Sequence, residues 1–365
     1  MKKVLAIMLA VVMCLGLAAC GSKEAPAPAA STPAPAASTP APAASTPAPA
    51  ASTPAASGPV YEETVLQLAH VNAVDNACAL SYDMWNDLLK TKSDGKVSLD
   101  IYPAGQLYGQ QDADDACTLG ELDITQADIS VLTSKVPRAG VLCLAMFYTS
   151  YEKAAKVFYG PVGDKVNEAI ADTCNYHIMG WMWNGFRNIA SRDQLDELAD
   201  CKGYKLRSPA TDLYLNTFIP MGFSPVQTAW GEAYTAMQSG LVDAVESGIA
   251  ALYQTGFCTL GGHVTKTNHI LSVIGPCMNK DTWEGLSPDV QKLLADTWAE
   301  AQAWENEKVA GDEQVYFDKC VEEGIQVHEW KNPQELLDLF TPQWSETAEK
   351  GGFSDLFEEA LKAIQ

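Results

Sequence analysis

Apolar and polar residues follow one another along this chain in the pattern of a protein that alternates strands and helices. Short apolar runs with strand composition alternate with longer stretches whose apolar residues recur every three or four positions. The strands expected from the short runs cover residues 65–69, 96–102, 123–127, 176–183, 187–190 and 204–207. The helices expected between them cover residues 80–92, 111–120, 150–173 and 232–239. This alternation favours an α/β fold with a parallel sheet covered by helices.

The last third of the chain has a helical pattern. Ser287 and Pro288 supply a cap and a first-turn proline, and Gly324 is a good terminator. A helix of about 36 residues between these signals would be roughly 54 Å long at about 1.5 Å per residue. Its apolar residues keep no sustained heptad, so we expect one long helix crossing two lobes. Two more helices, over 333–350 and 353–364, are expected to pack on the second lobe.

Residues 1–20 have the pattern of a targeting segment. Lys2 and Lys3 precede an apolar run, residues 4–19, that is too short to span a membrane. The run ends in Leu17-Ala18-Ala19-Cys20, which resembles a bacterial lipobox. This resemblance implies a lipoprotein signal peptide, with Cys20 lipidated and anchoring the exported chain at the outer side of the cell membrane. The alternative is an ordinary secretory signal with a chance cysteine.

Residues 21–60 form a linker of low complexity. The heptad STPAPAA begins at Ser31, Ser38 and Ser45, and begins again at Ser52. A segment of Pro, Ala, Ser and Thr has almost no surface to bury, so it cannot offset the entropy lost on ordering. We therefore expect a disordered, extended spacer.

The remaining residues, from 61 onward, are too many for one comfortable core and suggest two lobes. The formal net charge of −22 argues against nucleic acid and anionic membrane surfaces as partners. Eight of the ten cysteines lie in residues 61–365, scattered without zinc-type spacing, so we expect no metal site and mostly buried thiols there. The sequence also lacks the usual hydrolase, metalloprotease and nucleotide-binding motifs. We therefore expect neither an enzyme nor a cofactor.

Two arginines stand out because each ends or begins a strand-like run. Residues 204–207 are expected to form a strand that Pro209 stops, which leaves Arg207 near the carboxyl end. Arg187 begins the run 187–190. A guanidinium facing a crevice there can hold a carboxylate through two hydrogen bonds. The alternative for each arginine is an internal ion pair with Asp or Glu.

Four motifs surround or follow these arginines: NGFRN (184–188), KGYKLRSP (202–209), WGEAYTAMQSGLVDAVES (230–247) and TNHI (267–270). In these motifs the chain resembles the solute receptors of TRAP transporters, exported proteins that capture organic acids for sodium-driven uptake. The resemblance extends more loosely from about residue 66 to the end. It implies a two-lobe, periplasmic-binding-protein-like fold with a hinge and a long C-terminal helix spanning both lobes. The first lobe is expected to cover 61–184 with about 273–312, and the second 185–272 with about 313–365.

The resemblance also implies a ligand site. Arg207 matches the arginine that binds the ligand carboxylate in this family, and Arg187 matches one that reaches a second polar group. Trp230 matches an aromatic wall, with core packing as the alternative. Asp128 matches an acidic ligand-facing side chain, with a charge partner for an arginine as the alternative. Gln110 and Asn72 are weaker candidates, each with a surface-loop position as the alternative.

The chain departs from the family pattern at Ser247 and Gly248. The family usually shows Glu-Asn-Pro where this chain has Glu246-Ser247-Gly248. The asparagine amide normally donates to the bound carboxylate, whereas Ser247 is shorter and donates once. We expect Ser247 to line the site with altered geometry, and Gly248 to loosen the turn that follows.

These observations predict an extracytoplasmic lipoprotein that binds a small organic acid by closure of its two lobes. Its partners would be that ligand and the membrane subunits of a TRAP permease, and we expect it to act as a monomer. The alternatives are a receptor of an ABC-type importer, a receptor presented to a sensor, and a surface enzyme acting on organic acids.

Overall fold

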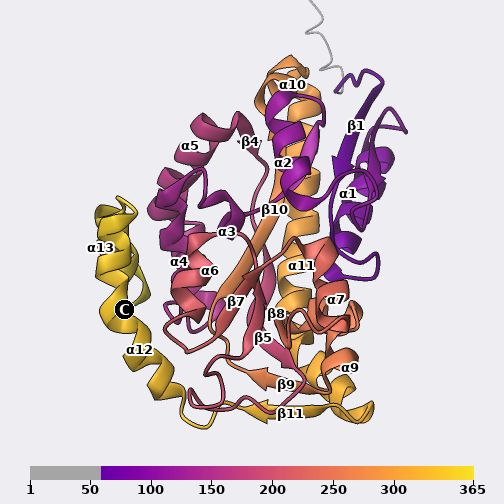
Figure 1. Ribbon diagram of the computed structural model, residues 1–365. Helices are drawn as coiled ribbons and strands as arrows, with labels where there is room; N and C mark the ends of the chain where they lie inside the picture. The colour runs from indigo at the N-terminus through magenta and orange to yellow at the C-terminus, as the bar shows by residue number, and fades with distance from the viewer. Residues whose placement is uncertain (1–58) are drawn as a thin grey trace, which may run out of the picture. The chain divides into compact units, whose positions relative to one another are not determined.

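The computed structural model describes residues 59–365. The expected signal peptide with Cys20 and nearly all of the expected linker lie outside the described residues. Figure 1 shows the elements of the described part. The strands are β1 (Thr64–Ala69), β2 (Val97–Tyr102), β3 (Ile124–Asp128), β4 (Tyr176–Ile178), β5 (Met182–Ser191), β6 (Lys205–Ser208), β7 (Ser224–Gln227), β8 (Ala244–Gly248), β9 (His263–Lys266), β10 (Leu271–Asn279) and β11 (Gln326–Glu329). The helices are α1 (Ala77–Lys92), α2 (Gln110–Leu119), α3 (Ile129–Leu132), α4 (Tyr151–Phe158), α5 (Pro161–Cys174), α6 (Asp212–Phe218), α7 (Trp230–Gln238), α8 (Ile249–Gln254), α9 (Phe257–Gly261), α10 (Lys280–Gly285), α11 (Pro288–Glu322), α12 (Pro333–Lys350) and α13 (Ser354–Ile364), with a 3-10 turn η1 (Pro137–Cys143).

The strands form one sheet with mixed strand directions. Their order is β2-β1-β3-β10-β5-β8-β6-β7, with β4 beside β10, β9 beside β5, and β11 beside β9. Strand β1 is parallel to β2 and β3, and β6 is parallel to β7 and β8. Strand β10 is antiparallel to β3 and β5, and β5 is antiparallel to β8. The α/β class is confirmed, but the expectation of a parallel sheet was wrong because β5 and β10 cross the middle against their neighbours.

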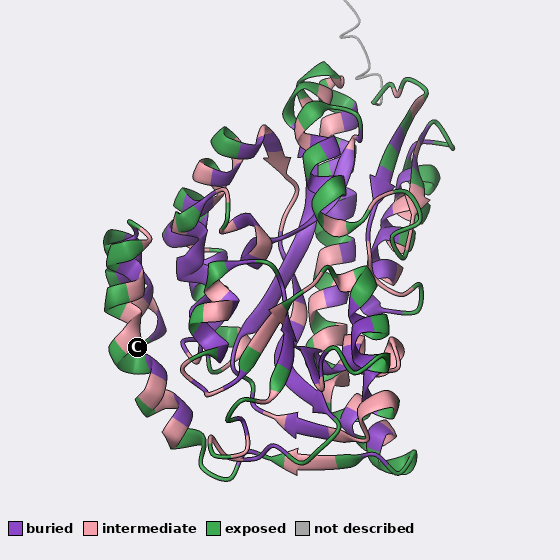
Figure 2. Ribbon diagram, in the orientation of Figure 1, coloured by how far each residue is buried: buried purple, intermediate pink, exposed green. Residues whose placement is uncertain are grey.

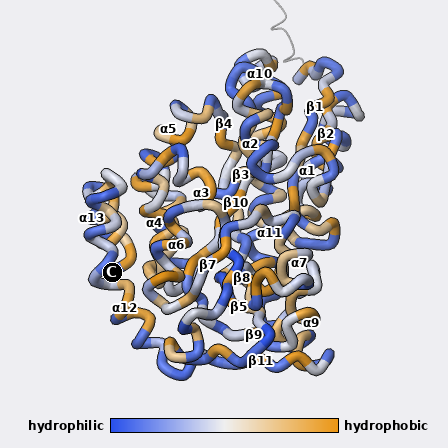
Figure 3. Tube along the Cα trace, in the orientation of Figure 1, coloured by the Kyte–Doolittle hydropathy of each residue, from blue (hydrophilic) through white to orange (hydrophobic). Residues whose placement is uncertain are grey.

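Strand β5 joins two halves of the sheet, and each half has its own core. Residues from Met182 to Phe186 pair with β10, and residues from Arg187 to Ser191 pair with β8. We call the half with β1–β4 and β10 the first lobe, and the half with β6–β9 and β11 the second lobe. Figure 2 shows buried residues along β5 and β10, and Figure 3 shows hydrophilic residues on outer parts of the helices. The expected residue boundaries between the lobes stay a prediction.

Helix α11 is the expected long helix and contacts both lobes. Ser287 caps it by accepting a hydrogen bond from the backbone N–H of Val290, and Gly324 follows its end with a positive φ of 82°. Near its start, Trp298 packs in the core that contains α1 and β1. Near its end, Phe317 packs in a core of the second lobe. The prediction of one helix spanning both lobes is therefore confirmed.

Two expectations about helices were wrong. The single helix expected over 150–173 is broken into α4 and α5 at Gly160 and Pro161, since proline has no N–H and disfavours helical geometry in the residue before it. The last helix, α13, was expected on the second lobe. It packs instead against α4, α5 and η1, because its apolar side chains Leu356 and Phe357 join the core of the first lobe.

The cysteines of the described part are all unpaired and buried, which confirms the expectation of buried thiols. They are Cys78, Cys117, Cys143, Cys174, Cys201, Cys258, Cys277 and Cys320. Burial raises the pKa of Cys117 and of Cys201 to about 12. These two thiols therefore stay protonated and unreactive at neutral pH.

Candidate functional site

A pocket lies where strand ends of the two lobes meet, with about 600 Å³ of empty space including its open mouth. The loop after β1, the start of α2 and the end of β3 line it from the first lobe, and β6, α7, β8 and α8 line it from the second lobe. All seven side chains expected at a ligand site lie in its wall. They are Asn72, Gln110, Asp128, Arg187, Arg207, Trp230 and Ser247. Their contacts differ, and so do the roles that each can play.

Arg187 is engaged with an internal acid. Its Nη2 donates to Oε1 of Glu246 at 2.8 Å, its Nε donates to Oε2, and its Nη1 donates to Ser272 at 3.1 Å. Burial disfavours the charge of Arg187, but Glu246 outweighs burial and raises the pKa of the guanidinium. The pair forms because β5 and β8 are antiparallel neighbours. Arg187 therefore lines the pocket with its charge already balanced.

Glu246 is the acid that holds this arrangement together. Its side chain is fully buried, and His269 lies 3.3 Å from its Oε2. Burial alone would raise the pKa of Glu246, yet Arg187 and His269 lower it below its ordinary value. The hydroxyl of Thr267 lies 2.7 Å from the other nitrogen of His269. The sequence motif around His269 is therefore part of the support for Arg187, which fits a structural role.

Arg207 differs from Arg187 because within residues 59–365 no carboxylate lies within 4 Å of its guanidinium. It is 4% exposed, and its Nε and Nη2 donate to the backbone oxygen of Thr228 at 3.0 and 2.6 Å. Burial lowers the pKa of Arg207 to about 10, with Glu246 opposing the shift and the charge of Arg187 adding to it. The group stays charged at neutral pH. A buried cation without a counterion is costly, so Arg207 favours an anionic ligand.

Trp230 contacts both the pocket and the core. Its ring lies 5.5 Å from the guanidinium carbon of Arg207, within the range of a cation–π contact. It also packs against Phe257, with ring centroids 5.5 Å apart and an interplanar angle of 60°. The helix begins at Trp230, two residues earlier than expected. Trp230 thus lines the pocket with an apolar surface and also packs in the core, so the structure shows both of the positions that were considered for it.

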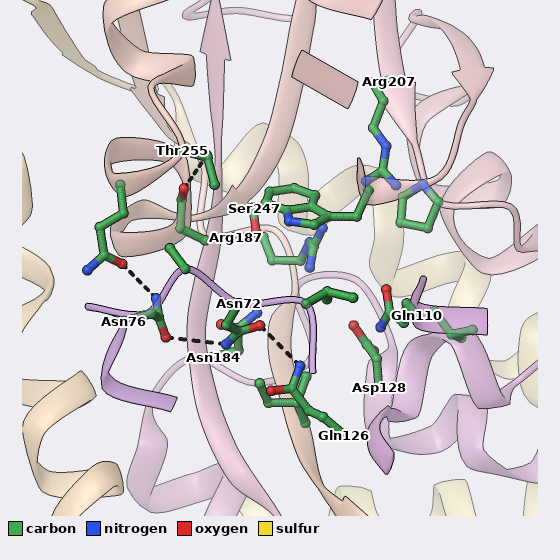
Figure 4. Close-up of a pocket in the computed structure, with 18 residues that line it drawn as sticks. Asn72, Asn76, Gln110, Gln126, Asp128, Asn184, Arg187, Arg207, Ser247 and Thr255 are labelled. Atoms are coloured by element: carbon green, nitrogen blue, oxygen red, sulfur yellow. Dashed lines mark hydrogen bonds between the residues drawn. The ribbon is translucent and has the colours of Figure 1, made fainter. Parts of the chain in front are cut away.

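Asp128 ends β3 and caps α3. Its Oδ1 accepts hydrogen bonds from the backbone N–H of Ser130 at 2.8 Å and from the Ser130 hydroxyl. No arginine or lysine of the described part forms an ion pair with it, so the alternative of an internal charge pair is wrong. Figure 4 shows Asp128 and Arg207 on facing sides of the pocket.

Amide side chains form a hydrogen-bonded series along one wall, and most of them were missed in the sequence. Gln126 donates to Asn72 at 3.1 Å, Asn72 donates to Asn76 at 3.3 Å, and Asn76 donates to Gln254 at 2.7 Å (Figure 4). Asn184 of β5 lines the same wall. Asn76 lies four residues after the candidate Asn72, but Gln254 lies 178 residues from Asn76 and gave no sequence signal. The bond between Asn76 and Gln254 links the first lobe to the second.

Ser247 and Gly248 replace the residues usual in the resembling family. Ser247 is buried at the pocket wall, and within residues 59–365 its hydroxyl has no hydrogen-bond partner. Gly248 has a φ of −57°, which proline also adopts, so its backbone keeps the conformation that proline would fix, and the looser turn stays a prediction. A Cβ at Gly248 would lie 2.1 Å from the backbone oxygen of Asn184. The glycine therefore permits a close approach of β8 to β5.

A group of three acidic residues that do not line the pocket was considered as a cation site. The carboxylates of Asp196, Glu197 and Asp200 lie within 4.8 Å of one another. Lys331 forms ion pairs with Asp196 at 2.9 Å and with Glu197 at 3.3 Å. Since lysine already balances part of this charge, the group supports no metal assignment.

Comparison with known proteins identifies the family. The model of the family described as bacterial extracellular solute-binding protein, family 7 (DctP), matches residues 68–350. The chain belongs to this family. The resemblance to TRAP solute receptors and the two-lobe α/β fold are thereby confirmed, because the matched residues include both arginines and all of α11. Relatives in this family are receptors that bind solutes.

Individual relatives support the same assignment. The chain is 28% identical to a solute-binding protein of Roseobacter denitrificans over 250 residues, covering 68% of this chain and 77% of that protein. It is 27% identical to a sialic acid-binding periplasmic protein of Vibrio cholerae over 239 residues, covering 66% and 74%. The crystal structure of a TRAP periplasmic solute-binding protein from Bradyrhizobium in complex with galacturonate is 25% identical, with a TM-score of 0.76 and coverage of 81% and 99%.

The family is described as extracellular, and the described residues contain no candidate membrane-spanning helix. No helix within residues 59–365 combines the length and the apolar character needed to cross a bilayer.

Proposed function

We propose that this chain captures a small organic acid outside the cytoplasmic membrane and delivers it to a TRAP-type permease. Arg207 supplies the charge for the ligand carboxylate, and Trp230 packs against the ligand body. The observation that carries the proposal is the buried guanidinium of Arg207, which faces the pocket without a carboxylate partner among the described residues. The bound acids of the relatives, sialic acid and galacturonate, are carboxylates and agree with this reading.

Lobe closure is the proposed mechanism of capture. The pocket wall contains side chains from both lobes, and the hydrogen bond between Asn76 and Gln254 joins them across the pocket. A ligand that touches both walls stabilises the closed form by its preferential affinity for that form. We propose that the permease recognises the closed form, and that a lipid on Cys20 holds the receptor near it. The sequence contains no feature that favours an enzyme over this receptor.

Calorimetric titration of residues 58–365 with a panel of organic acids tests the proposal. At least one acid should bind the wild-type chain. Arg207→Met, which keeps the side-chain bulk but removes the charge, should weaken that binding by about 30-fold to more than 1,000-fold, the usual cost of removing one partner of a buried charge pair. Arg192→Met is the matched control, since Arg192 is exposed and lies outside the pocket wall.

The two variants separate the possible results. Loss of binding in Arg207→Met with normal binding in Arg192→Met supports the carboxylate site. Equal binding by wild type and Arg207→Met would show that Arg207 has only a structural role. If no carboxylic acid binds the wild-type chain, the proposed function is wrong.

A further inference from the structure

The charges of the pocket restrict which acids fit it. Among the residues that line it, three carry charge: Asp128, Arg187 and Arg207. The charge of Arg187 is balanced by Glu246, as described above. The pocket therefore presents one cation, Arg207, and one anion, Asp128, that influence each other electrostatically without forming an ion pair. A ligand with one carboxylate satisfies Arg207 and leaves no cation for a second.

The free oxygen of Asp128 requires a hydrogen-bond donor. Its Oδ1 accepts both bonds from Ser130, and its Oδ2 has no donor within residues 59–365. The side chain is 8% exposed and borders the pocket. A ligand carboxylate placed there would set two anions against each other beside a largely buried carboxylate, and such a like-charge contact opposes binding. A ligand hydroxyl instead donates to the oxygen.

A second acceptor lies on the same face of β3. Gln126 and Asp128 are two residues apart, so their side chains point to the same side of the strand, roughly 7 Å apart along it. Gln126 is 3% exposed, its Nε2 donates to Asn72, and its Oε1 is buried without a partner among the described residues. An unpaired buried acceptor is costly, so the ligand should supply a donor here as well. Two donors at this spacing must lie several bonds apart in the ligand.

From this arrangement we propose that the ligand is a monocarboxylate with hydroxyl groups along its carbon chain, and that Asp128 excludes dicarboxylates. The proposal rests on the proposed function, since it assumes that the ligand carboxylate binds Arg207. Asp128 and Gln126 then accept hydrogen bonds from hydroxyls farther along the ligand. Asp128 is a specificity-determining residue because a hydroxyl satisfies its oxygen and a carboxylate at the same position is repelled.

Matched pairs of sugar-derived acids test the proposal at neutral pH. Aldonates with four, five and six carbons are titrated beside aldarates of the same length and configuration, which differ only by a carboxylate in place of the terminal hydroxymethyl group. The unsubstituted fatty acids of the same lengths, and aminated acids with an ammonium in place of one hydroxyl, complete the panel. The wild-type chain should bind at least one aldonate, and at least 30-fold more tightly than its aldarate.

Asp128→Asn is the decisive variant. Asparagine caps a helix about as well as aspartate, so α3 should be preserved. The variant removes the negative charge but keeps an acceptor oxygen, so it should reduce the preference for the aldonate over its aldarate by at least tenfold. Thermal unfolding of the variant confirms that it is folded.

The outcomes distinguish this inference from the proposed function. An aldonate preference below 30-fold in the wild type, or a preference that Asp128→Asn reduces by less than tenfold, overturns the inference. If the unsubstituted or the aminated acids bind more tightly than the aldonates, the inference is also overturned. The proposed function would still stand if the binding of those acids depends on Arg207. If no acid of any kind binds, both ideas fail together.

Discussion

Replacing Glu246 by glutamine tests the buried ion pair that supports the pocket. The substitution keeps the size of the side chain and removes the charge that balances Arg187. Arg187 and Glu246 side chains are 4% and 0% exposed, so the guanidinium would be left buried without its counterion. Breaking such a pair by removing one partner costs about 3–5 kcal/mol of unfolding free energy.

This cost translates into a shift of the melting temperature. A folded part of about 300 residues has an unfolding entropy of about 0.6 kcal/mol per kelvin, at about 2.1 cal/mol/K per residue. We therefore expect Glu246→Gln to lower the melting temperature by about 5–8 °C at pH 7, measured by calorimetry. Glu300→Gln is the control, because Glu300 forms an ion pair with Lys92 whose side chains are 50% and 40% exposed. That substitution should change little.

The pH dependence has a definite sign. The pKa of Glu246 in the folded protein lies below the ordinary value of 4.5, since Arg187 and His269 outweigh the effect of burial. Its contribution to stability is complete above that ordinary value and disappears as the pH falls through the folded value. The difference in melting temperature between wild type and Glu246→Gln should therefore become smaller in acid. If Glu246→Gln lowers the melting temperature at pH 7 by no more than Glu300→Gln does, the reasoning is refuted.

Three further substitutions probe the backbone and the long helix. Gly248→Ala would place a Cβ 2.1 Å from a backbone oxygen and should lower both the melting temperature and the ligand affinity. Gly311→Ala, in open space within α11, should instead stabilise the protein by up to about 1 kcal/mol. If calorimetry gave both variants the same change in melting temperature, the close approach of β8 to β5 at Gly248 would be contradicted. Burial raises the pKa of Glu305 to about 8, so its contribution to stability is complete below its ordinary pKa of 4.5 and is lost as the pH rises through 8. The melting temperature of the wild type should fall between pH 5 and 9, and that of Glu305→Gln should fall less. If the two melting temperatures fall in parallel with pH, Glu305 does not cause the loss of stability.

Local signals in the sequence predicted the elements that need only local information. The capping serine and the terminating glycine defined α11 to within a residue. Pro209 defined the end of the strand that carries Arg207. The family motifs supplied four residues of the pocket wall, Arg187, Arg207, Trp230 and Ser247, and the looser resemblance outside these motifs added Asp128, Gln110 and Asn72.

Long-range pairing was outside the reach of the sequence pattern. Glu246 and Arg187 are 59 positions apart, and only the antiparallel pairing of β5 with β8 shows that the acid belongs to that arginine and not to Arg207. The directions of β5 and β10 depend on how distant strands pair, so apolar runs alone could not predict a mixed sheet. The link from Asn76 to Gln254 joins residues 178 positions apart for the same reason.

The buried cysteines make the receptor a convenient reporter. Since the eight thiols of residues 59–365 are shielded from solvent, a cysteine introduced on the surface would be the accessible attachment point in that part of the chain. Asp75 is exposed beside the pocket, and its backbone oxygen accepts a hydrogen bond from Gln254 of the opposite lobe. A fluorophore attached through Asp75→Cys would change its surroundings when the lobes move, so a single label could report ligand concentration optically without disturbing the native thiols.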